Sequence, residues 1–275
     1  MKLESHFVDI HGLRKHYVSA GTGPVVVLLH GFPDTHAIWQ RQIPALVAGG
    51  MRVIAPDLRG YGQTDAPASI GAYAIEFLCA DILGLMDKLG LATVSLVGHD
   101  WGGLVGWQLC MDAPQRFERF VALSTGHPAA IAGAGVAQQM RFWYVLGFLM
   151  PVVAETAIRA TDWFFLRQLT NRPEQLALWR AALEPEGRLT AALNYYRANI
   201  KLGRPHHWCP VKVPVMGVWS DRDPALGEKQ MLDSLHHCRA GFRYERLERA
   251  GHWMQLSATD RLNALLLDFL RPAVL

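Results

Sequence analysis

The sequence predicts an α/β fold in which a mostly parallel, doubly wound sheet is interrupted by a helical insertion. Three observations predict it. Short apolar segments alternate with helical spacing up to about residue 126, this rhythm stops over 127–205, and it returns in 206–275. Strands that alternate with helices form parallel sheets through right-handed crossovers. We therefore expect one core, residues 1–126 with 206–275, and a helical lid formed by residues 127–205.

The first part of the chain supplies most of the predicted strands. Its third β-rich segment, Val25–Leu29, is apolar on both faces, as expected of a central strand that is covered on both sides. Two β-rich segments come before it, and alternating strands and helices follow it. The predicted strands are 6–10, 16–20, 25–29, 52–55, 94–97 and 120–123, and the predicted helices are 73–89 and 102–111.

The middle of the chain shows helical spacing alone, in four runs at 137–148, 157–169, 173–183 and 189–200. Strand patterns return at 213–219 and 242–247, and a helix is expected at 260–270. Ligands of open α/β sheets bind beyond the carboxyl ends of the strands. An insertion that leaves the sheet at this edge should therefore lie over the ligand.

The composition excludes several classes of protein. The 275 residues are 51% hydrophobic and carry a net charge of +3 without a basic block, so no nucleic-acid partner is expected. The longest uncharged apolar stretch, Phe142–Ala154, is too short to span a membrane, and the N-terminus shows no signal-peptide pattern. A cytoplasmic location is the default expectation. The four cysteines lack metal or redox spacing, and we expect them to be reduced and mostly buried.

The strongest local signal is Gly-His-Asp-Trp-Gly-Gly at 98–103, between a predicted strand and a predicted helix. Glycines two residues before and after Asp100 permit the sharp turn of a nucleophile elbow, here with Asp in place of Ser. The alternative is that Asp100 only caps the helix. A carboxylate that attacks a saturated carbon forms an ordinary ester. As a nucleophile, Asp100 therefore predicts an alkylating electrophile as substrate.

Hydrolysis of such an ester needs a general base and an orienting acid. His252 follows a glycine in the loop after the last strand and is the candidate base. In the loop after the preceding strand, Asp223 is the preferred acid, whereas Asp221 stands where it can cap the turn, and a shared role stays open. The chain order of Asp100, Asp223 and His252 is that of enzymes with a nucleophile elbow.

The tetrahedral intermediate needs an oxyanion site. The backbone N–H groups of Phe32, in the loop His30-Gly31-Phe32-Pro33 after the central strand, and of Trp101 are the candidate donors.

These motifs give the chain a resemblance to the epoxide hydrolases of the α/β-hydrolase fold. The resemblance rests on 30–33, 57–62, 98–103, Asp223 and 251–253, and so covers essentially the whole chain. It implies an enzyme that opens an epoxide on the aspartate and hydrolyses the ester to a vicinal diol. A small apolar epoxide and water are the expected substrates, no metal or organic cofactor is implied, and a homodimer stays open.

The resemblance further implies two lid tyrosines that donate to the departing oxygen. The segments 144–151 and 194–197 resemble the family's, which assigns these roles to Tyr144 and Tyr196. Tyr195 stays open as an alternative to Tyr196, because adjacent helical residues point about 100° apart. The expected pocket lining is His30, Pro33, Trp101, Phe148 and Trp253.

Two other functions use the same motifs. A haloalkane dehalogenase would need N–H donors for a halide, which Trp101 with Trp143 or Trp163 could supply. Against it, Phe32 stands where many dehalogenases carry Asn, and both lid tyrosines are present. A non-catalytic, ligand-binding relative would be expected to lack a catalytic residue, and none is missing. A serine esterase is disfavoured by Asp100 itself.

Overall fold

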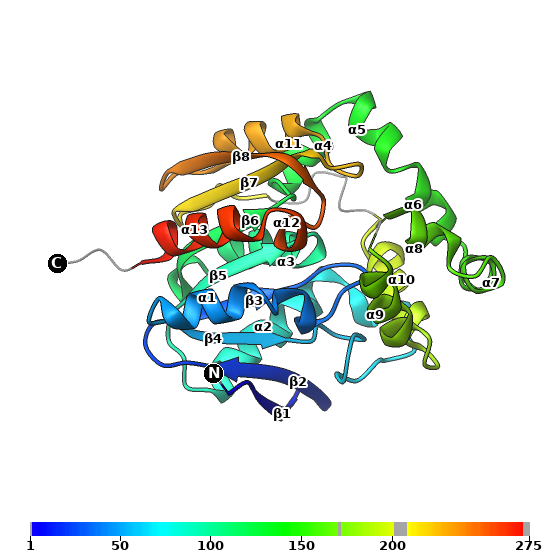
Figure 1. Cartoon of the computed structure of the whole chain (residues 1–275), viewed down its shortest axis with the longest axis horizontal. Coiled ribbons are helices and arrows are strands. Elements are labelled where there is room, and N and C mark those ends of the chain that lie inside the picture. Colours follow the sequence, from blue (N-terminus) through cyan, green and yellow to red (C-terminus); the bar gives the residue numbers. More distant parts are fainter. Residues whose placement is uncertain (1, 170–171, 201–207, 272–275) are drawn as a thin grey trace.

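A computed structural model describes residues 2–169, 172–200 and 208–271 of the chain. Its centre is an eight-stranded sheet with the order β1-β2-β4-β3-β5-β6-β7-β8 (Figure 1). β2 pairs antiparallel with both β1 and β4, and the remaining pairs are parallel. The predicted mostly parallel sheet is therefore confirmed.

Every predicted strand is present, most of them one to four residues longer than expected. The central strand β3 has the predicted bounds, and all but its first residue are buried. The strands are β1 Glu4–Ile10, β2 Leu13–Ala20, β3 Val25–Leu29, β4 Arg52–Pro56, β5 Val94–His99, β6 Phe117–Leu123, β7 Val215–Arg222 and β8 Phe242–Gly251.

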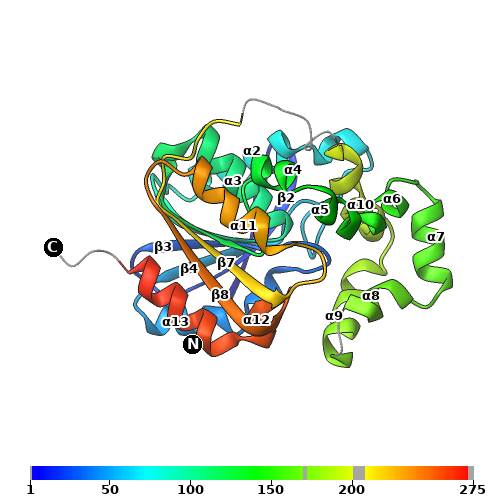
Figure 2. The ribbon, with the colours of Figure 1, turned by 90° about the horizontal axis from the view of Figure 1, so that it is seen from above.

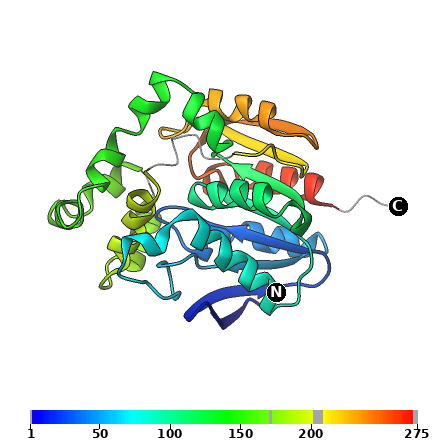
Figure 3. The same cartoon turned by 180° about the vertical axis from the view of Figure 1, so that it is seen from behind.

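Helices cover both faces of the sheet, as a doubly wound fold requires (Figures 1 and 3). One face carries α1 (Gln42–Ala48), α12 (Met254–Ser257) and α13 (Thr259–Leu270). The other carries α2 (Ile75–Lys88), α3 (Trp101–Asp112) and α11 (Glu228–Asp233). The sequence did not predict the short helices α1, α11 and α12. Short 3-10 helices occur at η1 His36–Trp39, η2 Ile70–Tyr73, η3 Pro114–Arg116 and η5 Ser234–His237.

Between β6 and residue 200, the part of the chain that the structure describes contains helices and no strand. Helices α5–α10, called the lid below, lie beyond the carboxyl ends of the parallel strands (Figures 1 and 2). The predicted end of the insertion near residue 205 lies outside the described residues. The helices are α4 Pro128–Gly133, α5 Val136–Arg141, α6 Trp143–Phe148, α7 Val153–Ala160, α8 Phe164–Leu169, α9 Pro173–Leu183 and α10 Arg188–Ala198.

The lid is tied to the core by polar contacts in addition to apolar packing. The Tyr195 hydroxyl on α10 donates to the carbonyl of Arg59 at 2.8 Å, and Asn199 accepts from the Ile75 N–H at 2.9 Å. The Trp179 indole on α9 donates to Asp34 at 2.7 Å. These contacts fix the lid helices above the sheet edge at which the site residues meet.

Two further expectations are answered by the fold. No helix in the described ranges is long and apolar enough to cross a bilayer. All four cysteines are free, but only Cys79 and Cys110 are buried, whereas Cys209 is exposed and Cys238 is partly exposed. The expectation of mostly buried cysteines is therefore right for two of the four.

Candidate active site

Asp100 lies on a strained turn between β5 and α3. Its φ of 52° and ψ of −118° fall in a region that a non-glycine residue rarely adopts. A Cβ added at Gly98 would collide with the carbonyl of Gly102, and one at Gly102 with the carbonyl of Leu29. The glycines thus permit the close approach that the sequence predicted. The carboxylate makes no side-chain cap to the helix, so the capping alternative is wrong.

The loop after β3 supplies a hydrogen-bond donor to this carboxylate. The Phe32 N–H donates to Oδ1 of Asp100 at 2.7 Å, and the backbone N–H groups of Phe32 and Trp101 both act to lower the pKa of the carboxyl. Gly31 must lack a side chain here, because an added Cβ would collide with Asp100. The Phe32 N–H therefore holds Oδ1, whereas Oδ2 lies on the side of His252, 3.8 Å from Nε2.

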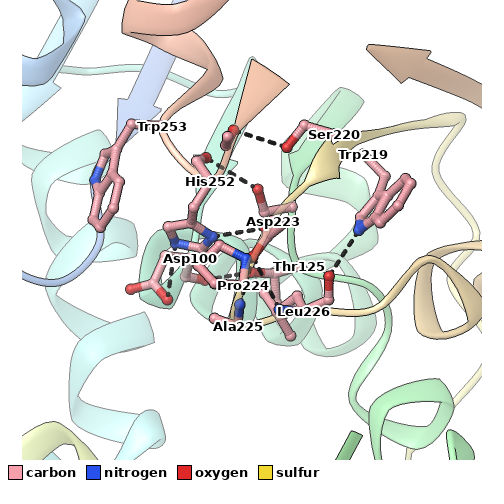
Figure 4. Close-up of polar contacts among 12 residues, drawn as sticks. Asp100, Thr125, Trp219, Ser220, Asp223, Pro224, Ala225, Leu226, His252 and Trp253 are labelled. Carbon is pink, nitrogen blue, oxygen red and sulfur yellow. Dashed lines mark hydrogen bonds and ion pairs between the residues drawn. The ribbon is translucent and has the colours of Figure 1, made fainter. Parts of the chain in front are cut away.

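His252 lies between two carboxylates (Figure 4). Its Nδ1 is 2.8 Å from Oδ2 of Asp223, and its Nε2 is 3.8 Å from Oδ2 of Asp100. The other oxygen of Asp223 accepts the N–H groups of Ala225 and Leu226, which fixes its orientation. Asp221 instead accepts the N–H of Ala250 at 3.3 Å on β8. The structure thus brings Asp223, and not Asp221, to the histidine.

Burial and charge set the proton affinities at this site. Burial alone would lower the pKa of His252, but the carboxylates of Asp223, Asp100 and Asp34 outweigh it and raise the pKa to about 9. Burial also raises the pKa of Asp100, against the opposing effects of His252 and the two N–H donors. The imidazole therefore keeps its proton while Asp100 is charged.

Asp34 is a buried acid that the sequence analysis missed. It accepts hydrogen bonds from the indole N–H groups of Trp179, on the lid, at 2.7 Å and of Trp253, beside His252, at 2.8 Å. Burial raises its pKa to about 7. The available signal was a carboxylate two residues after the oxyanion loop residue Phe32, but its partners lie far away in the sequence.

Two cavities meet at Asp100. One has a volume of about 320 Å³ and the other about 560 Å³, and Asp100, Tyr144, Tyr196 and Ala225 line both. Burial, and next the charge of Asp100, raise the pKa values of Tyr144 and Tyr196, so both hydroxyls stay protonated. Tyr195 faces away and donates to the core. Of the two neighbours, Tyr196 is the one in the pocket.

The predicted pocket lining is only partly right. Trp101 lines the smaller cavity and Trp253 the larger one. His30 is fully buried and accepts the N–H of Leu58, because its ring points into the core. Pro33 borders a separate small cavity under α9. Phe148 packs behind the pocket against the rings of Phe32, Tyr144 and Tyr196 instead of lining either cavity.

The candidate halide donors differ in whether they border a cavity. Trp143 borders the larger cavity, whereas the buried Trp163 borders neither of the two. Trp101 lies beside the nucleophile, but its ring also packs edge-on against Tyr196 at 5.1 Å.

The described residues contain one group whose ligand atoms converge closely enough for a metal ion, namely His16, His36 and Asp57. Each imidazole Nδ1 is 2.7 Å from one oxygen of Asp57, and the His36 N–H donates to the same carboxylate. Burial opposes these hydrogen bonds, which nevertheless hold the pKa of Asp57 far below its usual range. The group borders neither cavity and clamps the loop that leads from Phe32 into η1.

Comparison with known proteins agrees with this geometry. Residues 24–259 match the family model of the alpha/beta hydrolase fold. The chain belongs to this family. It is 33% identical to AB hydrolase superfamily protein YfhM of Bacillus subtilis and 32% identical to Epoxide hydrolase 3 of Siraitia grosvenorii, and each match covers 98% of both chains.

Solved structures give the same picture for this alpha/beta hydrolase. An epoxide hydrolase from Vigna radiata is similar with a TM-score of 0.86 and 32% identity, over 97% of both chains. Epoxide Hydrolase A from Mycobacterium thermoresistibile is similar with a TM-score of 0.82 and 30% identity, over 98% of both chains.

Proposed function

We propose that this alpha/beta hydrolase is an epoxide hydrolase, in which residues 127–205 cap a core that carries Asp100, Asp223 and His252. One observation carries the proposal: two protonated tyrosine hydroxyls border the same cavities as the aspartate nucleophile. A leaving oxygen that stays attached to its carbon skeleton needs such donors. The relatives named as epoxide hydrolases support the proposal.

The first step is attack on the epoxide ring. Oδ2 of Asp100 attacks a ring carbon, because Oδ1 is held by the Phe32 N–H. The carbon–oxygen bond of the ring breaks, its electron pair goes to the oxygen, and Tyr144 or Tyr196 supplies the proton. The products are a hydroxyalkyl ester on Asp100 and a tyrosinate. The imidazolium of His252 returns a proton to the tyrosinate through water and becomes neutral.

The second step hydrolyses the ester. Esterification removes the charge of Asp100, which lowers the pKa of His252, so the imidazole becomes a neutral base. It takes a proton from water through Nε2, while Asp223 holds Nδ1. The hydroxide adds to the ester carbonyl, and the Phe32 and Trp101 N–H groups bind the oxyanion. Collapse of the intermediate breaks the bond to the alkoxide oxygen, which takes the proton from His252 and leaves as the diol. The carboxylic acid that remains gives its proton to His252, which regenerates the carboxylate.

The alternatives have less support. A haloalkane dehalogenase would need N–H donors aimed at a halide. The two tyrosine hydroxyls would have no role in its reaction. A non-catalytic binding protein would not need His252 between two carboxylates at 2.8 and 3.8 Å.

The test is to trap the ester. A His252→Gln variant keeps the size of the side chain but removes the base, so an adduct on Asp100 should accumulate. We expect intact-mass measurement after incubation with a styrene oxide-type epoxide to show an increase by one epoxide mass, and peptide mapping to place it on Asp100. An Asp100→Asn/His252→Gln variant is the control and should give no adduct. An adduct formed with a haloalkane but not with the epoxide would reject the proposal.

A further inference from the structure

The lid ends in an exposed apolar hairpin that the proposed chemistry does not explain. Helix α6, the turn at Pro151 and helix α7 form it, and α7 is the helix farthest from the sheet in all three views (Figures 1–3). At least half of the surface of each of six large apolar side chains is exposed here. This apolar tip consists of Trp143, Leu146, Met150, Val152, Val153 and the neighbouring Phe164 on α8.

The charges around the tip are arranged to keep it neutral. From Phe142 to Ile158 the one charged residue is Glu155, and it turns inward to pair with the buried Arg197 at 2.7 Å. Arg141 and Arg159 flank this stretch in the chain; both are exposed and donate to backbone carbonyls, Arg141 to that of Asp223 and Arg159 to that of Glu184. Beside Phe164, the charge of the exposed Asp162 is balanced by Arg167 and Arg180 at 3.3 and 3.1 Å. An uncharged tip with cations on either side complements a bilayer, whose acyl region excludes charge and whose phosphates attract it.

The turn of the hairpin is built from apolar residues at a conformational cost. Val152 has a φ of 68° and is 74% exposed, although β-branched residues rarely adopt positive φ. Glycine or asparagine would fit this exposed position better in water. An exposed valine side chain is stabilised when it leaves water, and insertion into an apolar phase would remove it from water.

The apolar tip is continuous with the substrate cavity. Trp143 and Phe164 belong to the tip and also line the larger cavity, which reaches Asp100 and His252. Exposed apolar surface that leads into an apolar pocket marks an interaction site. An apolar epoxide dissolved in lipid would meet the opening of the cavity at this surface.

We infer that the apolar tip docks the protein on a lipid bilayer, from which an apolar epoxide enters the larger cavity. Docking is peripheral, because the tip is a short hairpin that can reach only the outer part of the acyl region. The bilayer fits better than a second copy of the chain, because the tip protrudes as an uncharged point and not as a broad face with a polar rim. The identity of the delivered substrate rests on the proposed function, whereas the docking itself does not.

The experiment measures binding of the full chain to phosphatidylcholine vesicles by flotation. The Val152→Asp/Val153→Asp variant places two charges at the tip, and Asp tolerates the positive φ of residue 152 better than Val does. We expect its binding to fall at least tenfold. Leu235→Asp, at an exposed apolar residue of η5 in the core, is the matched control and should bind as the wild type does.

A second readout locates the contact. Brominated phosphatidylcholine should quench the fluorescence of Trp143, and Trp143→Phe should abolish most of this quenching. Absence of wild-type flotation would overturn the inference. A second result would also overturn it: the wild type forms a dimer and does not bind vesicles, and the Val152→Asp/Val153→Asp variant is a monomer. A second copy of the chain would then cover the tip.

An Asp100→Asn variant separates this inference from the proposed function. It cannot form the ester, but it should bind vesicles as the wild type does. If the wild type turns over the epoxide but does not bind vesicles, docking is rejected and the proposed function stands. If the wild type binds vesicles but turns over no epoxide, the proposed function is rejected and docking stands.

Discussion

At the scale of single residues, the proposed mechanism needs neighbouring groups in opposite protonation states. Asp100 must be a carboxylate to attack, and Tyr144 and Tyr196 must be neutral to donate. Burial raises the pKa of all three groups, but the two backbone N–H donors and His252 oppose the shift at Asp100 alone. The same low-polarity pocket therefore serves both a nucleophile and its acid partners.

The tyrosine pair gives the first prediction at this scale. In a Tyr144→Phe/Tyr196→Phe variant the leaving oxygen would depart as a bare alkoxide, so we expect ester formation to slow by about 10²–10⁴-fold. Each single variant should retain part of the rate. Rapid-quench measurement of ester formation tests this, and circular dichroism melting should show an unchanged fold. Turnover at the wild-type rate in the double variant would remove the tyrosines from the mechanism.

Asp34 gives a prediction on pH dependence. Its charge contributes to the raised pKa of His252, so Asp34→Asn should lower that pKa. Because His252 acts as a base in its neutral form, ester hydrolysis should then reach half of its maximal rate at a lower pH. Decay of the ester followed by stopped flow from pH 5 to 9 measures this. Trp179→Phe removes a hydrogen bond that lowers the pKa of Asp34, so it should move the half-maximal pH in the same direction as Asp34→Asn but by less.

At the scale of elements, a buried ion pair holds the lid helices together. Arg197 on α10 pairs with Glu155 on α7 at 2.7 Å and donates to the carbonyl of Phe148, the last residue of α6. Arg197 directly follows Tyr196, so these contacts also fix the tyrosine at the pocket. Three lid helices thus depend on one buried cation.

Removing its partner should cost substantial stability. In Glu155→Ala, Arg197 would be left buried without its counter-charge, and the free energy of unfolding should fall by about 3 kcal/mol. Urea denaturation followed by circular dichroism measures it. Glu174→Ala on α9, an exposed acid, is the control and should change the free energy by less than about 0.5 kcal/mol. Equal effects of both variants would contradict a special role of the ion pair.

Local sequence patterns predicted where helices and strands occur better than they predicted where a helix is interrupted. The bounds of β3 and α9 were predicted correctly, because an apolar run and a helix that begins at Pro173 are local signals. The runs 137–148 and 157–169 were predicted as single helices, yet they break at Phe142 and at Asp162–Trp163. The positive φ values of Asp162 and Trp163 carry no mark in the sequence, since neither is glycine.

The site residues divide in the same way into those that a local motif predicts and those that only the fold brings together. Asp100, Asp223 and His252 lie in motifs that can be read locally, and the chain order relates them. Asp34 could not be recognised, because its donors Trp179 and Trp253 are 145 and 219 residues away. His30 and Phe148 lie in or near motifs, but their side chains pack in the interior and do not line the pocket. His30 packs against the ring of Tyr61, and Phe148 packs against the ring of Phe32.

At the scale of the whole molecule, sheet edge and lid together form a pocket with two arms. Asp100, the proposed nucleophile, lines both arms. On the proposed function, an epoxide with a substituent on each ring carbon would place one substituent in each arm. A terminal epoxide needs only one arm. Leu104, on α3, lines the smaller arm, and Leu169, on α8, lines the larger one. The arms can therefore be narrowed separately.

Narrowing the smaller arm should change selectivity. In Leu104→Trp, we expect kcat/KM for a 1,2-disubstituted epoxide to fall at least about tenfold relative to a terminal epoxide, because the second substituent loses its space. Leu169→Trp narrows the larger arm, through which we infer that the epoxide enters, and should therefore lower kcat/KM for both substrates. Steady-state kinetics with matched alkyl epoxides measure the two ratios. Equal losses for both substrates in Leu104→Trp would show that the smaller cavity does not receive substrate.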